Sequence, residues 1–394
     1  MITLRQPTTD PDFVQNPYPF YERARSHGRF FRWQDYNLIC TPDAAACNAI
    51  FRDRRFGRET PAELAVRTPG HLQAFYGVEA HSMLELEPPR HTRLRGLVLR
   101  AFTTRRIAAL QPEIAALTHQ LIDGFPDGRF DLLTHFAQKL PVIIIARLLG
   151  VPESISDDLL RWSNAMVGMY TAGRSRQTED RAEMAARDFA EFLRGYIDLR
   201  RTTPADDLIT HLIAAEEAGE KLTTEELIST CILLLNAGHE ATVHTIGNGV
   251  KTLLETKTPL SALATDTVNG CIEEILRFDP ALHMFTRHVY EDVEVLGQSF
   301  KRGDQVGLLL AAANRDPKLW ANPDQFIANR TPKPHVSFGA GLHFCVGAPL
   351  ARLELQAALP ILMQRCPQLR LTESPEYANV YHFHGLKNLM VQTR

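Results

Sequence analysis

The sequence of 394 residues lacks long apolar runs and has no excess of charge of either sign. Its two most apolar segments, residues 140–150 and 228–237, are both shorter than the roughly 20 residues that a helix needs to cross a bilayer. A net charge of −3 gives no general attraction to nucleic acid or to an anionic membrane. We therefore expect neither nucleic acid nor membrane as a partner.

Paired cysteines are also missing. The six cysteines include no Cys-x-x-Cys pair, which disfavours a zinc site and an Fe–S cluster. Scattered single cysteines, without a signal-peptide pattern at the N-terminus, are typical of a protein in the reducing cytoplasm. No Gly-x-Gly-x-x-Gly motif follows a predicted strand, so a bound dinucleotide is not expected. Any electrons that the protein uses must therefore come from outside the chain.

What is present is an ordinary globular composition, 44% hydrophobic and 23% charged, without a linker or an internal repeat. We expect one domain over residues 1–394. Helical periodicity dominates, with predicted helices over residues 107–122, 181–200, 224–255, 265–278 and 346–364. Short strand signals lie at residues 30–39, 289–296, 305–310 and 379–391. The sequence thus predicts a mainly α protein with small accessory β-sheets.

The third predicted helix is unusually long. Thr223 and Glu226 form a capping-box pattern at its start, and the apolar pattern then continues to residue 255. At 1.5 Å per residue, a helix of about 30 residues would be ~45 Å long. Such a helix would cross the whole domain and be largely buried in its middle.

The most informative stretch is residues 338–347, in which glycines, an aromatic residue and a histidine surround Cys345. Val346 and Gly347 would be the first residues of the next helix, so their free N–H groups would point back at the sulfur. Such donors favour a thiolate over a thiol. A thiolate held in this way is suited to bind iron. A buried structural cysteine is the plain alternative, but several framing residues at fixed offsets disfavour it.

This stretch resembles the haem-binding loop of the cytochrome P450 family, Phe-x-x-Gly-x-His-x-Cys-x-Gly. The matching residues are Phe338, Gly341, His343, Cys345 and Gly347. The resemblance extends over nearly the whole chain and implies the cytochrome P450 fold. It also implies a haem b cofactor with Cys345 as the metal ligand, surrounded by Phe338, Gly339 and Gly347.

Glu274 and Arg277 are three residues apart in a predicted apolar helix, so their side chains share one face. A Glu-x-x-Arg pair alone is a weak signal, because most such pairs are solvated. Its place upstream of the Cys345 loop resembles the buried Glu-x-x-Arg pair of the family. The resemblance implies that Arg330, from the proline-rich segment 317–334, completes a structural triad.

Haem propionates require cations. Residues 88–95 resemble the family's Pro-Pro-x-His-Thr-Arg-Leu-Arg segment, which implies that His91 and Arg95 bind propionates. Arg287 and His343 hold positions that imply the same role. Arginine suits this task because its guanidinium group binds carboxylates in bidentate fashion. Each of these residues could instead be an ordinary basic residue on the surface. This alternative is strongest for His91 and Arg287.

Residues 233–242 resemble the family's distal segment, Ala-Gly-x-(Glu/Asp)-Thr. The resemblance implies that Ala237 and Gly238 leave room for dioxygen and that Glu240 relays protons. Ala241 departs from the pattern, because a threonine is expected there. Thr242 cannot simply replace it, since one residue rotates a side chain by about 100° on a helix of 3.6 residues per turn.

Three explanations for Ala241 remain open. A substrate hydroxyl group supplies the missing hydrogen bond, an ordered water supplies it, or the reaction does not need efficient O–O cleavage. The retained Glu240 favours the first two. We predict that restoring a threonine at position 241 changes the ratio of product to hydrogen peroxide.

Substrate contacts are predicted from position alone, and such residues belong to a plain core about as often as to a pocket. The candidates are Phe75, Met83, Met166, Met169, Leu234, His283, Met284, Phe285 and Phe383. Together they indicate an apolar substrate with a polar anchor, which His283 or Asn236 would supply.

The resemblance implies a monooxygenase that inserts one oxygen atom from O2 into a C–H bond of a mainly hydrophobic small molecule. Electrons would come from NAD(P)H through a ferredoxin and its reductase. A basic face for an acidic ferredoxin would comprise Arg93, Arg100, Arg105, Arg106 and Arg352, although a solvated helix face is an equal alternative.

Two other functions remain. Ala241 motivates a haem-thiolate enzyme of oxidative coupling or dehydration. A haem-based ligand sensor without turnover is disfavoured by Glu240 and by the lack of effector-domain sequence. We take a monomer as the default oligomeric state.

Overall fold

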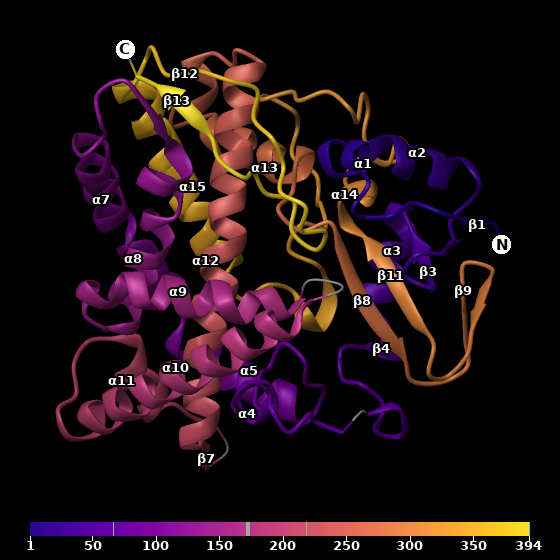
Figure 1. Ribbon diagram of the computed structural model, residues 1–394, viewed down its shortest axis with the longest axis horizontal. Helices are drawn as coiled ribbons and strands as arrows, with labels where there is room; N and C mark the ends of the chain where they lie inside the picture. The colour runs from indigo at the N-terminus through magenta and orange to yellow at the C-terminus, as the bar shows by residue number, and fades with distance from the viewer. Residues whose placement is uncertain (66, 171–173, 218, 394) are drawn as a thin grey trace.

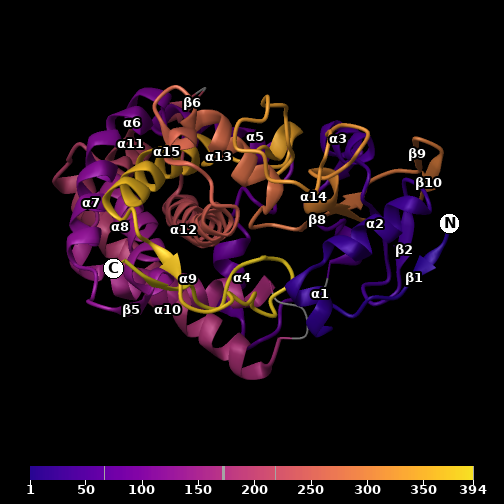
Figure 2. The same cartoon turned by 90° about the horizontal axis from the view of Figure 1, so that it is seen from above.

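The computed structural model describes residues 1–65, 67–170, 174–217 and 219–393. Helix α12 (Thr224–Glu255) runs through the middle of the molecule, with most helices on one side and the largest sheet on the other (Figure 1). Seen from above, α12 is viewed nearly end-on among surrounding helices (Figure 2). The described residues therefore form a mainly α fold with small sheets, as the sequence predicts.

Two groups of helices make up the α part. The helices before α12 are α1 (Pro11–Gln15), α2 (Tyr18–Ser26), α3 (Ala44–Arg52), α4 (Gln73–Glu79), α5 (Arg90–Ala101), α6 (Thr104–Ala109), α7 (Gln111–Asp123), α8 (Lys139–Leu149), α9 (Ser156–Val167), α10 (Arg176–Thr202) and α11 (Leu208–Ala214). Those after it are α13 (Val268–Phe278), α14 (Leu310–Ala313) and α15 (Ala348–Arg365). Helix α12 packs against α8, α9, α10, α13 and α15, so the core of the α part forms around it.

The largest sheet has the strand order β1 (Thr3–Leu4), β2 (Phe31–Trp33), β3 (Leu38–Thr41), β11 (Gln305–Leu309), β8 (Met284–Val289) and β4 (Phe56–Gly57). Smaller sheets pair β12 (Arg370–Leu371), β13 (Met390–Gln392) and β5 (Arg129–Asp131); β9 (Val293–Val295) with β10 (Gln298–Phe300); and β6 (Glu216–Glu217) with β7 (Glu220–Lys221). Strand β8 pairs antiparallel with β11 and leads the chain from α13 towards the Cys345 loop.

The long central helix begins where the sequence places it. Thr223 accepts a hydrogen bond from the N–H of Glu226, and the Glu226 side chain accepts one from the N–H of Thr223. This capping box satisfies donors that the first helical turn leaves free. The helix then runs for 32 residues, which is about 48 Å.

Several predicted boundaries are wrong. The predicted helix 107–122 is divided into α6 and α7 at Leu110, because Pro112 starts a new helix. The predicted strand 30–39 is a hairpin, in which β2 pairs antiparallel with β3 around a turn that contains Asn37 at φ 53°. Of the predicted strand 379–391, only the end at β13 is regular. Pairing between distant strands, which the local pattern does not contain, decides these cases.

Within the described residues, we find no helix with the length and apolar character that crossing a bilayer requires.

Candidate active site

The loop before Cys345 makes two tight turns that depend on glycine. Gly339 and Gly341 have φ of 66° and 70°, in the left-handed region. A Cβ atom on Gly341 would lie 2.0 Å from the carbonyl oxygen of Phe51, at the end of α3. The N–H of Cys345 donates to the carbonyl oxygen of Phe338 at 3.0 Å. The loop can therefore pack directly against α3 only because residue 341 is a glycine.

Cys345 differs from the other cysteines in its accessibility. Five of the six cysteines are buried, whereas Cys345 is partly exposed. The N–H groups of Gly347 and Ala348, at the start of α15, act on its sulfur to lower the pKa of the thiol. The sequence predicted Val346 and Gly347 as these donors, so one donor lies a residue later than expected.

The balance of forces on the Cys345 thiol also differs from the expectation. Burial raises its pKa and outweighs the two amide donors and the charges of Arg95 and Arg352, which act to lower it. The helix start alone therefore does not produce a thiolate. A bound metal cation would add the missing stabilisation, since a coordinating thiol is deprotonated.

Next to this loop, His91 and His343 lie together. Their ring centroids are 4.3 Å apart, and His343 Nε2 lies 2.9 Å from Glu87 Oε1. His91 is 1% exposed and its Nδ1 has no hydrogen-bond partner. Burial, with the charges of His343 and Arg95, lowers the pKa of His91 to about 4. Arg95 donates from Nη2 to the carbonyl oxygen of Phe344 at 2.7 Å, which ties α5 to the cysteine loop.

Arg287, on β8, is a buried cation without a counter-ion. It is 3% exposed, donates to the carbonyl oxygen of Thr286 at 2.8 Å and lies 5.0 Å from the ring of Phe51. No carboxylate among the described residues forms an ion pair with it. Burial lowers its pKa to about 9. A buried charge of this kind is costly unless an anion compensates it.

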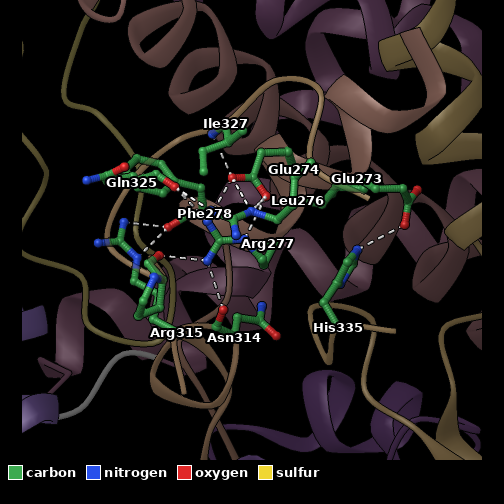
Figure 3. A network of polar contacts seen from close by, with 12 residues as sticks. Glu273, Glu274, Leu276, Arg277, Phe278, Asn314, Arg315, Gln325, Ile327 and His335 are labelled. Atoms are coloured by element: carbon green, nitrogen blue, oxygen red, sulfur yellow. Dashed lines mark hydrogen bonds and ion pairs between the residues drawn. The ribbon is translucent and has the colours of Figure 1, made fainter. Parts of the chain in front are cut away.

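The Glu-x-x-Arg helix carries a satisfied ion network (Figure 3). Arg277 donates from Nε and Nη2 to the two carboxylate oxygens of Glu274 at 2.7 and 2.8 Å. Arg330 Nε lies 3.0 Å from both of the same oxygens. Arg277 also donates to the carbonyl oxygens of Asn314, Pro323 and Gln325. The structure thus brings the three predicted residues together and anchors the segment before the cysteine loop.

On α12, no hydroxyl group replaces the one that Ala241 lacks. Thr242 Oγ1 donates to the carbonyl oxygen of Gly238 at 2.7 Å, and Thr245 Oγ1 donates to that of Ala241 at 2.7 Å. Both hydroxyls are therefore engaged by their own helix. This adds a second reason, beyond side-chain direction, why Thr242 does not stand in for the expected threonine.

Glu240 has an imidazole partner that the sequence reading missed. Its Oε1 lies 3.2 Å from His244 Nε2, one turn along α12, and its Oε2 lies 3.7 Å from His239 Nδ1. Burial acts to raise the pKa of Glu240, but the contact with His244 and the charges of both histidines lower it below its usual value. The spacing of four residues between Glu240 and His244 is the signal that could have revealed the pair.

The predicted pocket residues fall into separate groups. Five are buried in the core cluster around α12: Phe75, Met83, Met166, Met169 and Leu234. Asn236, on α12, has its Nδ2 3.7 Å from Met166 Sδ, while its Oδ1 has no partner. Phe285 lies near Gly339, and the ring of Phe383 is 5.5 Å from that of His244.

His283 and Met284 lie elsewhere. His283 is fully buried, with Nδ1 2.9 Å from the hydroxyl of Tyr21. Met284 belongs to the aromatic cluster of the N-terminal part, with Phe13 and Trp33. Successive side chains of a strand point to opposite faces, which separates Met284 from Phe285. His283 and Met284 therefore take part in the packing of the N-terminal segments, away from Phe285.

The predicted basic face is partly neutralised. Arg93 pairs with Glu226, Arg106 lies 3.2 Å from Asp206, and Arg352 lies 2.6 Å from Glu273. Arg100 and Arg105 are exposed. The local sequence does not show these carboxylates as partners, because they come from distant segments.

Known proteins match the chain over nearly its full length. A family model described as "Cytochrome P450" matches residues 264–376. The chain is 35% identical over 399 aligned residues to "Biotin biosynthesis cytochrome P450" of Bacillus subtilis, covering 99% of each. It is 36% identical to "Cytochrome P450 monooxygenase PikC" of Streptomyces venezuelae, covering 97% of this chain and 92% of that protein.

Among solved structures, P450BioI in complex with hexadec-9Z-enoic acid ligated acyl carrier protein matches with a TM-score of 0.91 and 35% identity. The match covers 97% of this chain and 100% of that chain.

Proposed function

Because the chain belongs to the cytochrome P450 family and is a monooxygenase of the bacterial class, we propose that it hydroxylates a mainly hydrophobic small molecule with one oxygen atom from O2. The observation that carries the proposal is the partly exposed Cys345 in its glycine-dependent loop, with two amide donors on its sulfur.

The residues around this loop fit a haem. The sulfur of Cys345, on a partly exposed residue, suits an iron ligand. The cation of Arg287, which has no ion pair among the described residues, and the unpartnered Nδ1 of His91 suit two propionates. We propose that Arg95 and His343 complete the propionate site. Phe338, Gly339 and Gly347 would enclose the ring on the cysteine side.

When bound, the haem supplies the activation of O2 that no side chain can provide. The chain would supply the rest of the chemistry. Small Ala237 and Gly238 leave space on the distal side, and Glu240 holds and releases protons at its carboxylate. Because the hydroxyls of Thr242 and Thr245 are engaged, we propose that a substrate hydroxyl group or an ordered water takes the role of the missing threonine.

The substrate is proposed to be apolar, with one hydrogen-bond donor. Phe75, Met83, Met166, Met169, Leu234, Phe285 and Phe383 provide apolar surface. The Oδ1 of Asn236 is a buried acceptor without a partner, so it would favour a hydroxyl or amine group on the substrate. Relatives named for biotin and polyketide biosynthesis support a biosynthetic small molecule of this class.

Electrons are proposed to come from NAD(P)H through a ferredoxin and its reductase. Arg100 and Arg105 would contribute to the docking face, whereas the carboxylates next to Arg93, Arg106 and Arg352 reduce its net charge. Raising the ionic strength should therefore slow electron transfer only modestly. No dependence on salt would argue against electrostatic docking.

The test is a titration of the haem-loaded protein with a library of small molecules, read as a spin-state shift of the haem spectrum. A compound that binds is then turned over under ¹⁸O2. Incorporation of ¹⁸O into the product supports hydroxylation. A product without ¹⁸O supports oxidative coupling or dehydration instead, and binding without any turnover supports a ligand sensor.

A further inference from the structure

Helix α12 is largely buried, and its C-terminal half carries a line of titratable and amide side chains along one face. The line consists of Glu240, His244, Asn248, Lys251 and Glu255. Steps of three and four residues keep them on the same face of an α-helix. We call this line the polar stripe of α12. It runs from the proposed proton donor to the C-terminal end of the helix.

The stripe reaches solvent at that end. The side chains of Glu240 and His244 are 20% and 12% exposed and Asn248 is fully buried, whereas Lys251 and Glu255 are 17% and 44% exposed, so accessibility rises only from Asn248 to the end of the helix. Lys251 Nζ lies 2.7 Å from Glu255 Oε2 and 5.4 Å from the ring of Tyr377. A proton taken up at the exposed Glu255 therefore meets titratable groups that lead inward.

Between the two ends, other segments add polar groups beside the stripe. Asn248 Nδ2 donates to the carbonyl oxygens of His384 and Asp279, at 2.8 and 3.3 Å. His384 stacks on Tyr377 with centroids 3.8 Å apart, and its Nε2 lies 3.6 Å from Asp279 Oδ1. The Tyr377 hydroxyl donates to the other oxygen of Asp279. This second row places an acid, an imidazole and a phenol alongside Asn248.

The ring of His244 packs so closely against the backbone of Gly385 that this residue has no room for a side chain. A Cβ atom on Gly385 would lie 1.8 Å from His244 Nδ1. The backbone of Gly385 therefore touches this nitrogen, directly after His384 in the chain. His244 Nδ1 is buried and has no hydrogen-bond partner, while its Nε2 faces Glu240. The ring thus presents one nitrogen to the acid and the other to the backbone of Gly385, which follows His384 of the second row.

We propose that protons consumed at the distal site enter along the polar stripe, and that His244 is the positioning residue that returns a proton to Glu240. This inference rests on the proposed monooxygenase function. Glu240 gives up its carboxyl proton and regains one from Nε2–H of protonated His244. Protonated His244 forms beforehand, when the neutral ring that carries Nε2–H takes a proton at Nδ1 from the side of Asp279 and His384. After the transfer to Glu240 the ring keeps Nδ1–H, and a ring flip or proton exchange restores the Nε2–H form. One proton enters from solvent for each proton that leaves, and no electron moves.

Titratable groups face His244 from its own helix and from the C-terminal segment. They are Glu240 and His239 on α12, and His384 on the C-terminal segment, with Asp279 beyond it. Because Ala241 has no hydroxyl and those of Thr242 and Thr245 are engaged, Glu240 depends on this imidazole and not on a hydroxyl group of α12.

Three variants test the route in the haem-loaded protein. His244→Asn retains a donor for Glu240 but cannot carry a proton, Gly385→Ala pushes the imidazole out of its seat, and Lys251→Met alters the solvent end. Thr252→Val is the control, since it removes a buried hydroxyl beside the stripe that does not titrate. Hydrogen peroxide released per NAD(P)H, and the effect of D2O on product formation, are measured for each.

We expect His244→Asn to lower NAD(P)H-driven product formation by about tenfold and to raise peroxide release, in line with the loss of one proton-transfer group. Gly385→Ala should act in the same direction and Lys251→Met more weakly. Turnover driven by added hydrogen peroxide should be nearly unchanged, because peroxide brings its own protons. Thr252→Val should match the wild type in every assay.

A measurement independent of turnover accompanies these assays. In the ¹⁵N-histidine NMR spectrum of the reduced, carbon-monoxide-bound protein, the His244 signal is assigned by its absence in His244→Asn. Its ring shifts should change in Glu240→Gln and in Gly385→Ala.

Unchanged product-to-peroxide ratios in both His244→Asn and Gly385→Ala would overturn the route, even if hydroxylation itself is observed. Equal losses in the NAD(P)H-driven and peroxide-driven reactions would also overturn it, because they indicate general damage to the site. If the wild type forms no ¹⁸O-labelled product, the proposed function fails, and this outcome is distinct from failure of the route.

Discussion

Arg277 and Arg287 are ten residues apart and almost equally buried, at 1% and 3% exposure, but their surroundings are opposite. Arg277 is bound by the carboxylate of Glu274 and by three carbonyl oxygens. Arg287 has one carbonyl oxygen of its neighbour and no carboxylate among the described residues. The first arginine completes its own network, whereas the second has no ion pair among the described residues and feels carboxylate charge only from the more distant Glu87 and Glu85.

This difference distinguishes a buried arginine with a structural role from one that is available to bind a ligand. Folded proteins pair nearly all of their buried polar groups, so the exceptions require an explanation. Two of the buried atoms without a partner, His91 Nδ1 and Asn236 Oδ1, belong to residues proposed to face haem or substrate, while others, such as Trp162 Nε1 and Ser163 Oγ, have no such role. Arg287 has a carbonyl partner but no ion pair within the part of the chain that the structure describes. The satisfied network of Glu274, by contrast, contains no group left for a ligand.

The largest expected effect is a loss of folding free energy when the network of Arg277 and Glu274 is broken. Arg277→Ala leaves the buried Glu274 carboxylate with Arg330 as its one remaining ion-pair partner among the described residues, which should cost about 3–5 kcal/mol of folding free energy. Urea unfolding of the haem-loaded protein measures the loss. The control is Arg176→Ala, which breaks an exposed pair with Asp180 and should cost less than about 1 kcal/mol. Similar losses for both variants would contradict a structural role of the triad.

Replacing Arg287, which has no ion pair in the described part of the chain, should affect haem binding and not folding stability. Arg287→Met removes an uncompensated buried charge, so haem-free protein should be no less stable than the wild type. Haem affinity should fall about ten- to a hundredfold, because a charge-assisted hydrogen bond contributes roughly 1.5–3 kcal/mol. Transfer of haem to apomyoglobin measures this loss. Arg25→Met, which removes a donor to the carbonyl oxygen of Ala312, should leave transfer unchanged.

A smaller effect concerns pH. The lowered pKa of His91, about 4, means that the unfolded chain binds its proton more readily than the folded one. Haem-free protein should therefore lose stability as pH falls from about 6.5 towards 4, with up to about 2 kcal/mol of the loss between pH 7 and 5 due to His91. His91→Gln should reduce this pH dependence. With haem bound, a propionate next to the imidazole should reduce it as well, and an equal dependence in both forms would argue against that contact.

The smallest expected effect adds a hydroxyl group to the distal side. Ala241→Thr should lower hydrogen peroxide release relative to product by about two- to tenfold, the equivalent of one hydrogen bond. Ala241→Val, which has a similar shape without the hydroxyl, is the control. The same ratio in Ala241→Thr and in the wild type would place position 241 outside the proton path.

The sequence predicted best what local pattern decides. The start of α12 follows from Thr223 and Glu226, and the turns of the cysteine loop follow from its glycines. The triad of Glu274, Arg277 and Arg330 was found through family resemblance, because an isolated Glu-x-x-Arg pair is ambiguous.

The sequence predicted poorly what distant segments decide. The direction of Met284 depends on the pairing of β8 with β11, and the neutralisation of Arg352 depends on Glu273 in another helix. The pKa of Cys345 depends on burial as well as on the helix start. The partnership of Glu240 with His244 was visible in the spacing but needed the structure to distinguish it from a chance pair.

The central claim is that the groups left open around Cys345 are completed by a haem with a thiolate ligand. The reduced, carbon-monoxide difference spectrum of the purified protein tests it most directly, with Cys345→Ser as the comparison. We predict a red-shifted Soret band in the wild type that is lost in the variant. A Soret band at the position of histidine- or thiol-ligated haem, or protein that binds no haem, would contradict the claim.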